Sequence, residues 1–259
     1  MSIIRDGDQV LFYLDSRRTW LLRVEKGKSF HLHRGILNFD DVIGQRFGSL
    51  ISTSKNVFVA ALPSLPRDRA IKLGRNTNIV YPKDAGLIIV LAGIGPGSRV
   101  VEAGTGSGAL ASLLGYHVSP NGAVYSYEIR EDFAEMAKKN LEKLGLSEII
   151  QVKQRDVLEG IEEQDVDAVI LDLAVPWDVV PLAYPALRGG GVLVSFSPTI
   201  EQTQRTVEAL YASHFIEIET RELIEREILV RTGKTRPATR MIGHTGYVTS
   251  ARKVFPPES

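Results

Sequence analysis

The segment of this chain best suited to chemistry is the glycine-rich run Glu102-Ala-Gly-Thr-Gly-Ser-Gly108, which directly follows the apolar residues of a short predicted strand. Glycines allow a backbone to approach a ligand closely, and a helix that starts here presents free N–H groups to it. This context predicts a cofactor-binding turn. With Ala109 the run also satisfies the dinucleotide fingerprint G-x-G-x-x-A, and a plain turn between a strand and a helix is the alternative to both.

Three acidic residues follow later apolar runs, each at a run's end. They are Glu128, Asp156 and Asp172. The carboxyl ends of parallel strands meet at one edge of a sheet, where open α/β sheets bind ligands. Glu128 lies 24 residues after Gly104, where an acid can accept hydrogen bonds from both ribose hydroxyls. Each acid alone is equally typical of a helix cap or a solvated loop, but the three together predict a shared site.

The segment Asp172-Leu-Ala-Val-Pro-Trp177 combines a carboxylate, a proline and an indole. Asp172 can accept a hydrogen bond from an exocyclic amine, and Trp177 can stack on a base. The segment therefore predicts a pocket for a flat polar ring. Packing in the hydrophobic core is the alternative for Trp177.

Alternating strand and helix patterns from residue 84 onward supply the elements that position these residues. The predicted strands are Arg99–Ala103, Ala123–Tyr127, Ile149–Val152, Val166–Leu171, Gly191–Phe196, Phe215–Val230 and Tyr247–Arg252. The predicted helices are Ala85–Leu91 (capped by Asp84), Ser107–Tyr116, Asp132–Leu144, Val180–Leu187 and Glu201–Tyr211. This alternation predicts an α/β fold with a parallel sheet, right-handed crossovers and helices on both faces.

The first 65 residues have a different pattern, with short strands separated by Gly and Asp turns, which predicts a small β-rich domain. Pro63 and Pro66 then interrupt any strand or helix. We therefore expect a β-rich domain over 1–65, a linker over 66–81 and the α/β domain over 82–259.

Composition excludes several classes of protein. The 259 residues include no cysteine, which excludes disulfide scaffolds, Cys-ligated metals and thiol catalysis, and five histidines leave little for a metal site. No window reaches 18 apolar residues, and the N-terminal residues carry charges where a signal peptide needs an apolar core. We expect no metal, no membrane association and a cytoplasmic location.

The chain resembles class I S-adenosylmethionine-dependent methyltransferases, and more narrowly the archaeal and bacterial tRNA adenine-58 N1-methyltransferases. The resemblance rests on the glycine-rich run, the segment Asp172–Trp177, and the motifs Tyr81-Pro-Lys-Asp84 and Gly243-His-Thr-Gly-Tyr247, in the family's order. It implies a Rossmann-like domain with a mostly parallel seven-stranded sheet and a small N-terminal β domain. It also implies methyl transfer to N1 of adenine 58 in the T-loop of tRNA, and it leaves open whether the neighbouring adenine is methylated too.

The resemblance assigns roles to individual residues. Asp172 would lie between the methyl donor and the target adenine, and Tyr81 would lie near the target base. His244 would shape the pocket or a subunit contact. The residues expected to bind S-adenosylmethionine are Gly104, Gly106, Ser107, Gly108, Ala109, Leu110, Glu128, Asp156, Val157 and Asp172. A homotetramer is expected by the same resemblance.

The net charge of zero conceals an uneven distribution. Residues 1–80 hold 13 basic and 7 acidic side chains, residues 81–220 hold 10 and 20, and residues 221–259 hold 8 and 4. Local positive charge is typical of RNA-binding surfaces. We therefore predict that Lys234, Arg236 and Arg240 contact RNA phosphates, with an ordinary solvated loop as the alternative.

Other functions remain open on the sequence alone. One is a nicotinamide-dependent oxidoreductase that uses the glycine-rich run, although no catalytic Tyr–Lys or His spacing accompanies it. Another is a class I methyltransferase acting on a small molecule or a protein. A third is a non-catalytic RNA-binding subunit, which would not need the intact glycines and Asp172.

Overall fold

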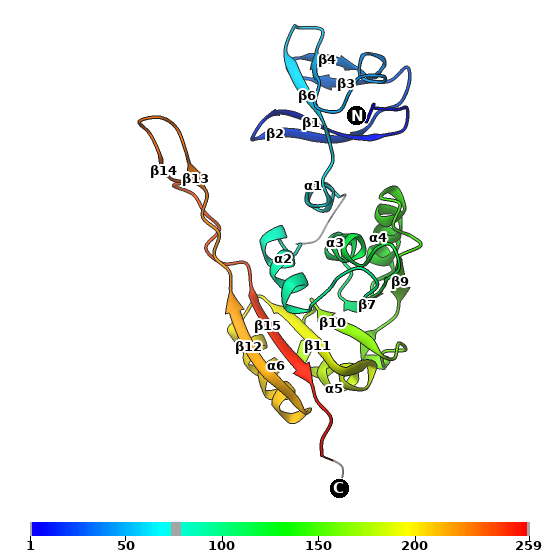
Figure 1. The fold of residues 1–259 in the computed structure, drawn as a ribbon, viewed down its shortest axis with the longest axis vertical. Coiled ribbons are helices and arrows are strands. Elements are labelled where there is room, and N and C mark those ends of the chain that lie inside the picture. Colours follow the sequence, from blue (N-terminus) through cyan, green and yellow to red (C-terminus); the bar gives the residue numbers. More distant parts are fainter. Residues whose placement is uncertain (1, 74–78, 258–259) are drawn as a thin grey trace. The chain divides into compact units, whose positions relative to one another are not determined.

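The computed structural model describes residues 2–73 and 79–257 and divides the chain into two compact units, which meet in sequence between Lys72 and Leu73 (Figure 1). The linker predicted over 66–81 contains a helix, α1 (Pro66–Lys72). Residues 74–78 of that predicted linker lie outside the described residues.

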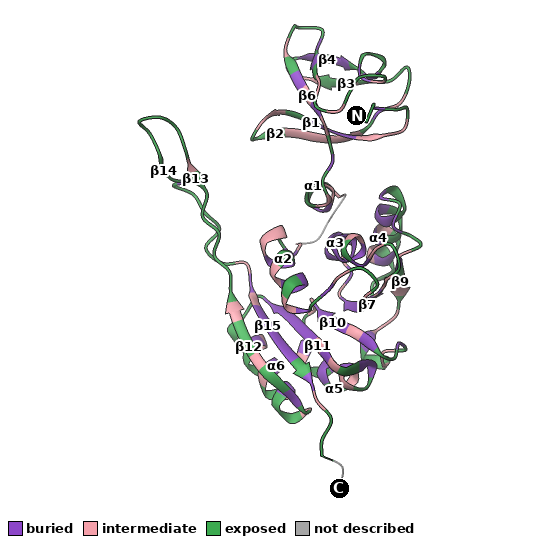
Figure 2. Cartoon of the chain, in the orientation of Figure 1, coloured by how far each residue is buried: buried purple, intermediate pink, exposed green. Residues whose placement is uncertain are grey.

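The N-terminal unit is built on antiparallel strands. A four-stranded sheet has the order β2-β1-β6-β5, and β3 pairs with β4 in a separate hairpin. The elements are β1 (Gln9–Asp15), β2 (Arg18–Arg23), β3 (Ser29–Leu32), β4 (Gly35–Asn38), the 3₁₀ turn η1 (Phe39–Asp41), β5 (Leu50–Ser52) and β6 (Phe58–Pro63). Its own core includes Phe12, Leu37 and Val59, each fully buried. Figure 2 shows buried stretches along the strands of this unit. A separate core explains why this segment forms a unit of its own.

The C-terminal unit contains a seven-stranded sheet with the order β12-β15-β11-β10-β7-β8-β9. Its strands are β7 (Arg99–Ala103), β8 (Ala123–Glu128), β9 (Ile150–Gln154), β10 (Val166–Leu171), β11 (Leu187–Ser197), β12 (Phe215–Glu222) and β15 (Tyr247–Lys253). The pairs from β11 to β9 are parallel, and β15 runs antiparallel to both of its neighbours. The prediction of a Rossmann-like α/β fold with a mostly parallel seven-stranded sheet and an N-terminal β region is confirmed.

Helices cover both faces of this sheet. They are α2 (Pro82–Leu91), α3 (Ala109–Val118), α4 (Glu131–Lys143), α5 (Pro176–Ala186) and α6 (Ile200–Ala212), with a 3₁₀ turn η2 (Val157–Glu159). α3 and α4 pack against β7, β8 and β9, whereas α5 and α6 pack together against the other side of the sheet (Figure 1). Because both faces are covered, the central strand β10 is apolar almost throughout, as its sequence Val-Asp-Ala-Val-Ile-Leu shows.

The structure corrects two sequence predictions near the sheet's edge. The helix predicted over Ala85–Leu91 begins earlier, with Pro82 at its first position and Tyr81 as N-cap, so Asp84 is not the cap. The strand predicted over Phe215–Val230 ends at Glu222. Residues 223–246 instead form a projecting two-stranded segment, the arm, which contains β13 (Ile228–Leu229) paired with β14 (Arg236–Pro237) (Figure 1).

In the part of the chain that the structure describes, no helix combines the length and the apolar character needed to cross a bilayer.

Candidate active site

The glycine-rich turn lies where the strand order reverses, because β8 adjoins one side of β7 and β10 adjoins the other. Such switch points are where open α/β sheets bind ligands. Gly104 follows β7 with a φ of +101°, and a Cβ added to it would lie 1.9 Å from the backbone carbonyl oxygen of Asp172. Only glycine fits at this position, since any side chain would collide with rigid backbone.

A cavity of about 560 Å³ opens beside this turn. Six of the ten predicted cofactor-binding residues line it, namely Gly104, Gly106, Glu128, Asp156, Val157 and Asp172. The other lining residues are Tyr127, Ile129, Arg130, Phe133, Arg155, Leu158, Leu173, Ala174 and Val175. The three acids at successive strand ends thus share one cavity, as their placement in the sequence predicts.

The carboxylate of Glu128 ties the end of β8 to the glycine-rich turn. Its Oε2 accepts a hydrogen bond from the backbone N–H of Gly106 at 2.9 Å, and its Oε1 accepts one from the N–H of Arg130 at 3.0 Å. The side chain is almost fully buried. Each oxygen keeps a free lone pair, so the carboxylate can still accept hydrogen bonds from two hydroxyls of a ligand.

Asp172 lies across from Gly104, at the end of β10. Its backbone N–H donates to the carbonyl of Ala103 at 2.9 Å. Its half-buried carboxylate accepts no hydrogen bond from any described residue, and desolvation raises the pKa of Asp172 to about 7. A carboxyl with a raised pKa in a cavity is typical of functional sites and would be stabilised in its ionised form by a cationic or hydrogen-bond-donating ligand.

Glu102, which the sequence predictions left without a role, is fully buried beneath this site. Its Oε2 accepts a hydrogen bond from Ser126, whose hydroxyl lies 2.6 Å from that of Thr105. Burial raises the pKa of Glu102 to about 8, although the Ser126 hydrogen bond lowers it, and the Asp172 and Glu128 carboxylates raise it further. Its place at the head of the glycine-rich run was the only signal in the sequence.

Two buried polar atoms at this turn have no hydrogen-bond partner among the described residues, Glu102 Oε1 and Ser107 Oγ. Unpaired buried polar groups are costly and uncommon in folded proteins. Ser107 follows Gly106, which lines the cavity, so its hydroxyl fits a ligand that brings a polar group to the turn. Glu102 is fully buried within β7, beneath the turn.

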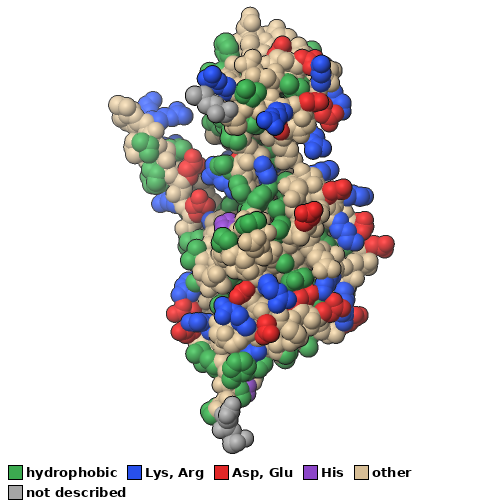
Figure 3. Space-filling model, turned by 45° about the vertical axis from the view of Figure 1, so that its right-hand side comes forward, with side chains coloured by type: hydrophobic (Ala, Val, Ile, Leu, Met, Phe, Trp, Pro, Cys, Tyr) green, Lys and Arg blue, Asp and Glu red, His purple; other side chains and the backbone are tan. Residues whose placement is uncertain are grey.

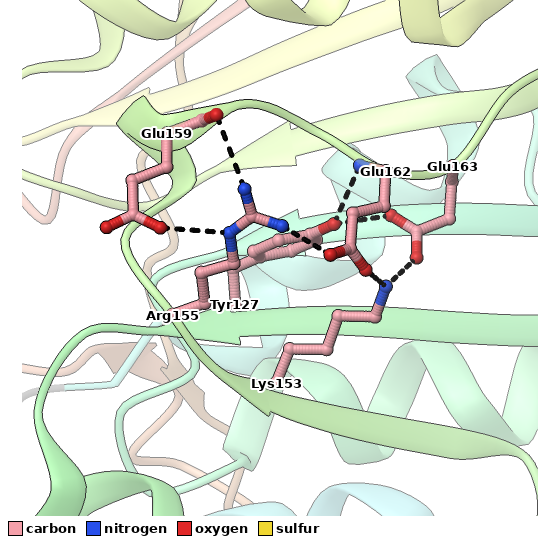
Figure 4. A network of polar contacts seen from close by, with 6 residues as sticks. All are labelled: Tyr127, Lys153, Arg155, Glu159, Glu162 and Glu163. Atoms are coloured by element: carbon pink, nitrogen blue, oxygen red, sulfur yellow. Dashed lines mark hydrogen bonds and ion pairs between the residues drawn. The ribbon is translucent and has the colours of Figure 1, made fainter.

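A polar network fixes the wall of the cavity after β9 (Figure 4). Tyr127 donates its hydroxyl to Glu163 Oε2 at 2.6 Å and accepts the N–H of Glu162 at 3.0 Å. Lys153 forms ion pairs with both glutamates. Arg155, which lines the cavity, pairs with Glu159 and Glu162. The segment that carries Asp156 and Val157 is therefore held at both ends.

The adjoining rim of the cavity has an apolar character that sequence patterns did not reveal. Ile129 is 62% exposed and Leu158 is 42% exposed, yet both line the cavity. The nearby side chain of Asp156 accepts the N–H of Leu158 at 2.9 Å, so it also acts as the cap of η2. Exposed apolar side chains beside an acid suit a flat ring with a polar edge.

Several predicted residues lie outside the cavity. Ser107, Gly108, Ala109 and Leu110 are buried in the turn and the first turn of α3. Trp177 is half-buried at the start of α5, where the Arg205 guanidinium lies 3.7 Å from its ring centre. Its indole therefore packs on α6 and does not line the cavity.

Four of the predicted substrate residues, Lys234, Arg236, Arg240 and His244, lie on the arm or at its base. Lys234, Arg236 and Arg240 are exposed, and Figure 3 shows basic, acidic and hydrophobic side chains on the surface of the arm, with basic ones near its tip. Tyr81, 43% exposed, precedes α2. His244 lies at the base of the arm, where its two ring nitrogens are 2.6 Å from Glu222 Oε1 and 2.9 Å from the Pro198 carbonyl. No described group of three or more His, Cys, Asp or Glu side chains could hold a metal ion.

The glycine-rich turn at a switch point, the acids at successive strand ends and the antiparallel β15 define a Rossmann-like methyltransferase domain. The family described as "tRNA methyltransferase complex GCD14 subunit" matches residues 57–239, and the family "TrmI-like N-terminal" matches residues 3–51. The chain belongs to this family of tRNA methyltransferases, as the sequence motifs predict.

Curated relatives cover nearly the whole chain. A Methanocaldococcus jannaschii protein, "tRNA (adenine(57)-N(1)/adenine(58)-N(1))-methyltransferase TrmI", is 39% identical, over 92% of this chain and 95% of its own. A Thermus thermophilus protein, "tRNA (adenine(58)-N(1))-methyltransferase TrmI", is 30% identical, over 91% of this chain and 93% of its own.

Solved structures share the complete fold. A Thermotoga maritima protein described as a SAM-dependent O-methyltransferase is 36% identical with a TM-score of 0.93, over 99% of this chain and 97% of its own. The Aquifex aeolicus tRNA (m1A58) methyltransferase TrmI is 26% identical with a TM-score of 0.86, over 98% of this chain and 100% of its own.

Proposed function

We propose that this chain transfers a methyl group from S-adenosylmethionine to N1 of adenine 58 in the T-loop of tRNA. The observation that carries the proposal is Asp172, which lines the cavity and whose backbone lies against Gly104, while its carboxylate has no hydrogen-bond partner among the described residues. The family and its curated relatives support tRNA as the substrate and adenine N1 as the target.

The residues present fit S-adenosylmethionine, which supplies an activated methyl group on a sulfonium centre when it is bound. The turn at Gly104 and Gly106 would hold its methionine part, with Ser107 Oγ as a free polar partner. Glu128 would accept the ribose hydroxyls with its remaining lone pairs. Asp156 and Val157 would hold the adenine between the exposed apolar rim residues. The acidic character of the site favours a cationic ligand.

The chemistry required of Asp172 is positioning and electrostatic stabilisation. Adenine N1 is neutral and carries a free lone pair, so no general base must act on it before attack. Asp172 would accept a hydrogen bond from the N6 amine, which orients N1 toward the methyl group at roughly 3 Å. Its ionised carboxylate would also stabilise the positive charge that develops on the ring.

The target atom lies on the Watson–Crick edge, so the adenine must be unpaired or flipped out of its stack to reach the cavity. Lys234, Arg236 and Arg240 on the arm would contact phosphates of the surrounding RNA. Tyr81 and His244 would flank the approach of the base, and the basic N-terminal unit would supply further RNA contacts. A homotetramer is part of this proposal.

The proposal is tested by incubating the protein with labelled S-adenosylmethionine and unmodified tRNA, followed by nuclease digestion and mass spectrometry. We expect 1-methyladenosine at position 58. A tRNA whose adenine 58 is replaced by guanine should carry no label at that position. The same digestion shows separately whether the neighbouring adenine carries a methyl group. A label on a hydroxyl oxygen, on protein or on a small molecule would contradict the proposal. A calorimetric titration with NAD provides the control for the oxidoreductase alternative, and we expect no binding.

A further inference from the structure

A closed ring of polar contacts joins the start of α2 to the end of the arm. The Lys83 ammonium donates to Asp84 Oδ1 at 2.7 Å and to Thr245 Oγ1 at 2.7 Å, and the Thr245 hydroxyl donates to Asp84 Oδ2 at 2.8 Å. Asp84 is fully buried, and the Lys83 side chain is 11% exposed. The ring thus connects two sequence motifs, Tyr81–Asp84 and Gly243–Tyr247, through buried charges.

The same ammonium also holds the beginning of the arm. Its third hydrogen bond goes to the backbone carbonyl of Leu223 at 2.6 Å, where the chain leaves β12. The three N–H donors of Lys83 are therefore all satisfied, by one residue of α2 and by both ends of the arm. His244, next to Thr245, pairs with Glu222, next to Leu223. The two ends of the arm cannot separate from α2 without exposing or breaking a buried ion pair.

The position of this ring relates it to the substrate side of the site. His244 also contacts the carbonyl of Pro198, directly after β11, and β11 adjoins β10, which ends at Asp172. The ring therefore lies at the same edge of the sheet as the cavity. Lys83, Asp84 and Thr245 are not among the described residues that line the cavity, so the ring is separate from the cavity wall.

Stability alone does not account for the ring. A buried ion pair is seldom more stabilising than well-packed apolar residues of the same volume, because desolvation offsets the attraction between its charges. What the charges add is a fixed geometry, since the hydrogen bonds are satisfied in only one arrangement. That arrangement fixes Tyr81, the N-cap of α2, relative to both ends of the arm.

We infer that Lys83, Asp84 and Thr245 are positioning residues that hold the arm and Tyr81 in one register, so that RNA bound along the arm presents its target base to the cavity. This inference rests on the proposed function and extends it from the cofactor side of the site to the RNA side. It predicts that loss of a hydrogen bond of this ring slows methyl transfer in the complex saturated with tRNA and S-adenosylmethionine. Electrostatic binding of tRNA to the arm should persist.

The test compares Thr245→Val, Thr245→Ser and the unaltered protein, with Thr220→Val as the matched control. Thr220 lies on β12 and its hydroxyl pairs with Thr249 at 2.8 Å, so the control also removes one threonine hydroxyl bond from the C-terminal unit. The maximal rate is divided by the concentration of S-adenosylhomocysteine-binding sites measured by calorimetry. The resulting normalised kcat refers to folded, binding-competent protein only. Hydrogen exchange at 222–224 and 244–247 gives a readout that is independent of activity.

For Thr245→Val we expect normalised kcat to fall at least tenfold, while KM for tRNA changes less than threefold. The affinity for S-adenosylhomocysteine should be unchanged, and hydrogen exchange at the base of the arm should be faster. Thr245→Ser keeps the hydroxyl and should restore kcat to within threefold, and Thr220→Val should match the unaltered protein. A normalised kcat within twofold of the unaltered protein, or a parallel loss of S-adenosylhomocysteine affinity, would overturn the inference. Unaltered protein that binds S-adenosylhomocysteine but methylates no tRNA would refute the proposed function itself.

Discussion

Replacing Asp172 with asparagine should stabilise the cofactor-free protein at alkaline pH while it removes activity. The carboxylate is half-buried in the cavity, and no described residue donates a hydrogen bond to it. Desolvation raises its pKa from 3.8 to about 7, so the folded state binds this proton more tightly than the unfolded state does. Its stabilising contribution is complete below the unfolded-state pKa and is lost as the pH rises through about 7.

The magnitude follows from linkage. The full change in pKa from 3.8 to about 7 corresponds to about 4 kcal/mol against the ionised form. At pH 5 the Asp172 carboxyl is ionised in the unfolded state but still protonated in the folded state, so part of this free-energy cost is already present at that pH. Between pH 5 and pH 8 the stability of Asp172→Asn relative to the unaltered protein should therefore rise by about 2–3 kcal/mol. The difference in packing between the Asp172 carboxyl and the asparagine amide does not depend on pH. It therefore cancels when the stability difference between the two proteins at pH 5 is compared with that at pH 8.

The assay is chemical denaturation at pH 5 and pH 8 without cofactor. The matched control is Asp132→Asn, because the hydrogen bond from exposed Arg130 lowers the pKa of Asp132 and so gives the opposite sign. Its relative stability should not improve as the pH rises. If Asp172→Asn shows the same relative stability at both pH values, or loses stability at pH 8, the carboxylate is held by favourable contacts and is not the uncompensated, desolvated group described above.

Three further predictions concern the turn, the arm and its base. Gly104→Ala should abolish S-adenosylhomocysteine binding and lower the melting temperature, because its Cβ would lie 1.9 Å from the Asp172 carbonyl oxygen; near-normal calorimetric affinity would contradict this. Charge reversal of Lys234 and Arg236 should weaken tRNA binding. It should also reduce the slope of log affinity against log salt concentration by about 0.7–0.9 for each RNA phosphate that the arm no longer neutralises. An unchanged slope would show that these two residues do not bind RNA phosphates. The hydrogen bond from His244 to Glu222 raises the pKa of the imidazole, so its NMR titration midpoint should exceed 6.5 and fall in Glu222→Gln; equal midpoints would rule out the pairing.

Much of the C-terminal unit was predictable because local signals agreed with the global fold. The glycine-rich run and the alternation of strands and helices predicted the turn after β7, and the parallel sheet then brought Glu128, Asp156 and Asp172 to one edge. This prediction needs only strand order and direction, which the pattern of apolar runs supplies.

Contacts between distant segments were not predictable. Asp84 has the residue type and position of a helix cap, but Pro82 starts α2 one turn earlier, and the carboxylate pairs instead with Lys83 and Thr245. For Trp177 the sequence left stacking on a base and packing in the core both open, and in the structure its ring lies against Arg205 from α6. Thr245 and Arg205 are distant in sequence from Asp84 and Trp177, so these two contacts leave no periodic or local signal and arise from tertiary packing.

The most direct test of the proposed site is a single-turnover measurement of methyl transfer to tRNA by Asp172→Ala saturated with S-adenosylmethionine, with S-adenosylhomocysteine affinity measured in parallel. We predict a rate at least about 100-fold below that of the unaltered protein, comparable to the loss of one preorganised electrostatic group, with a much smaller fall in affinity. A rate close to that of the unaltered protein would contradict the role of Asp172 and with it the assignment of this cavity as the methyl-transfer site.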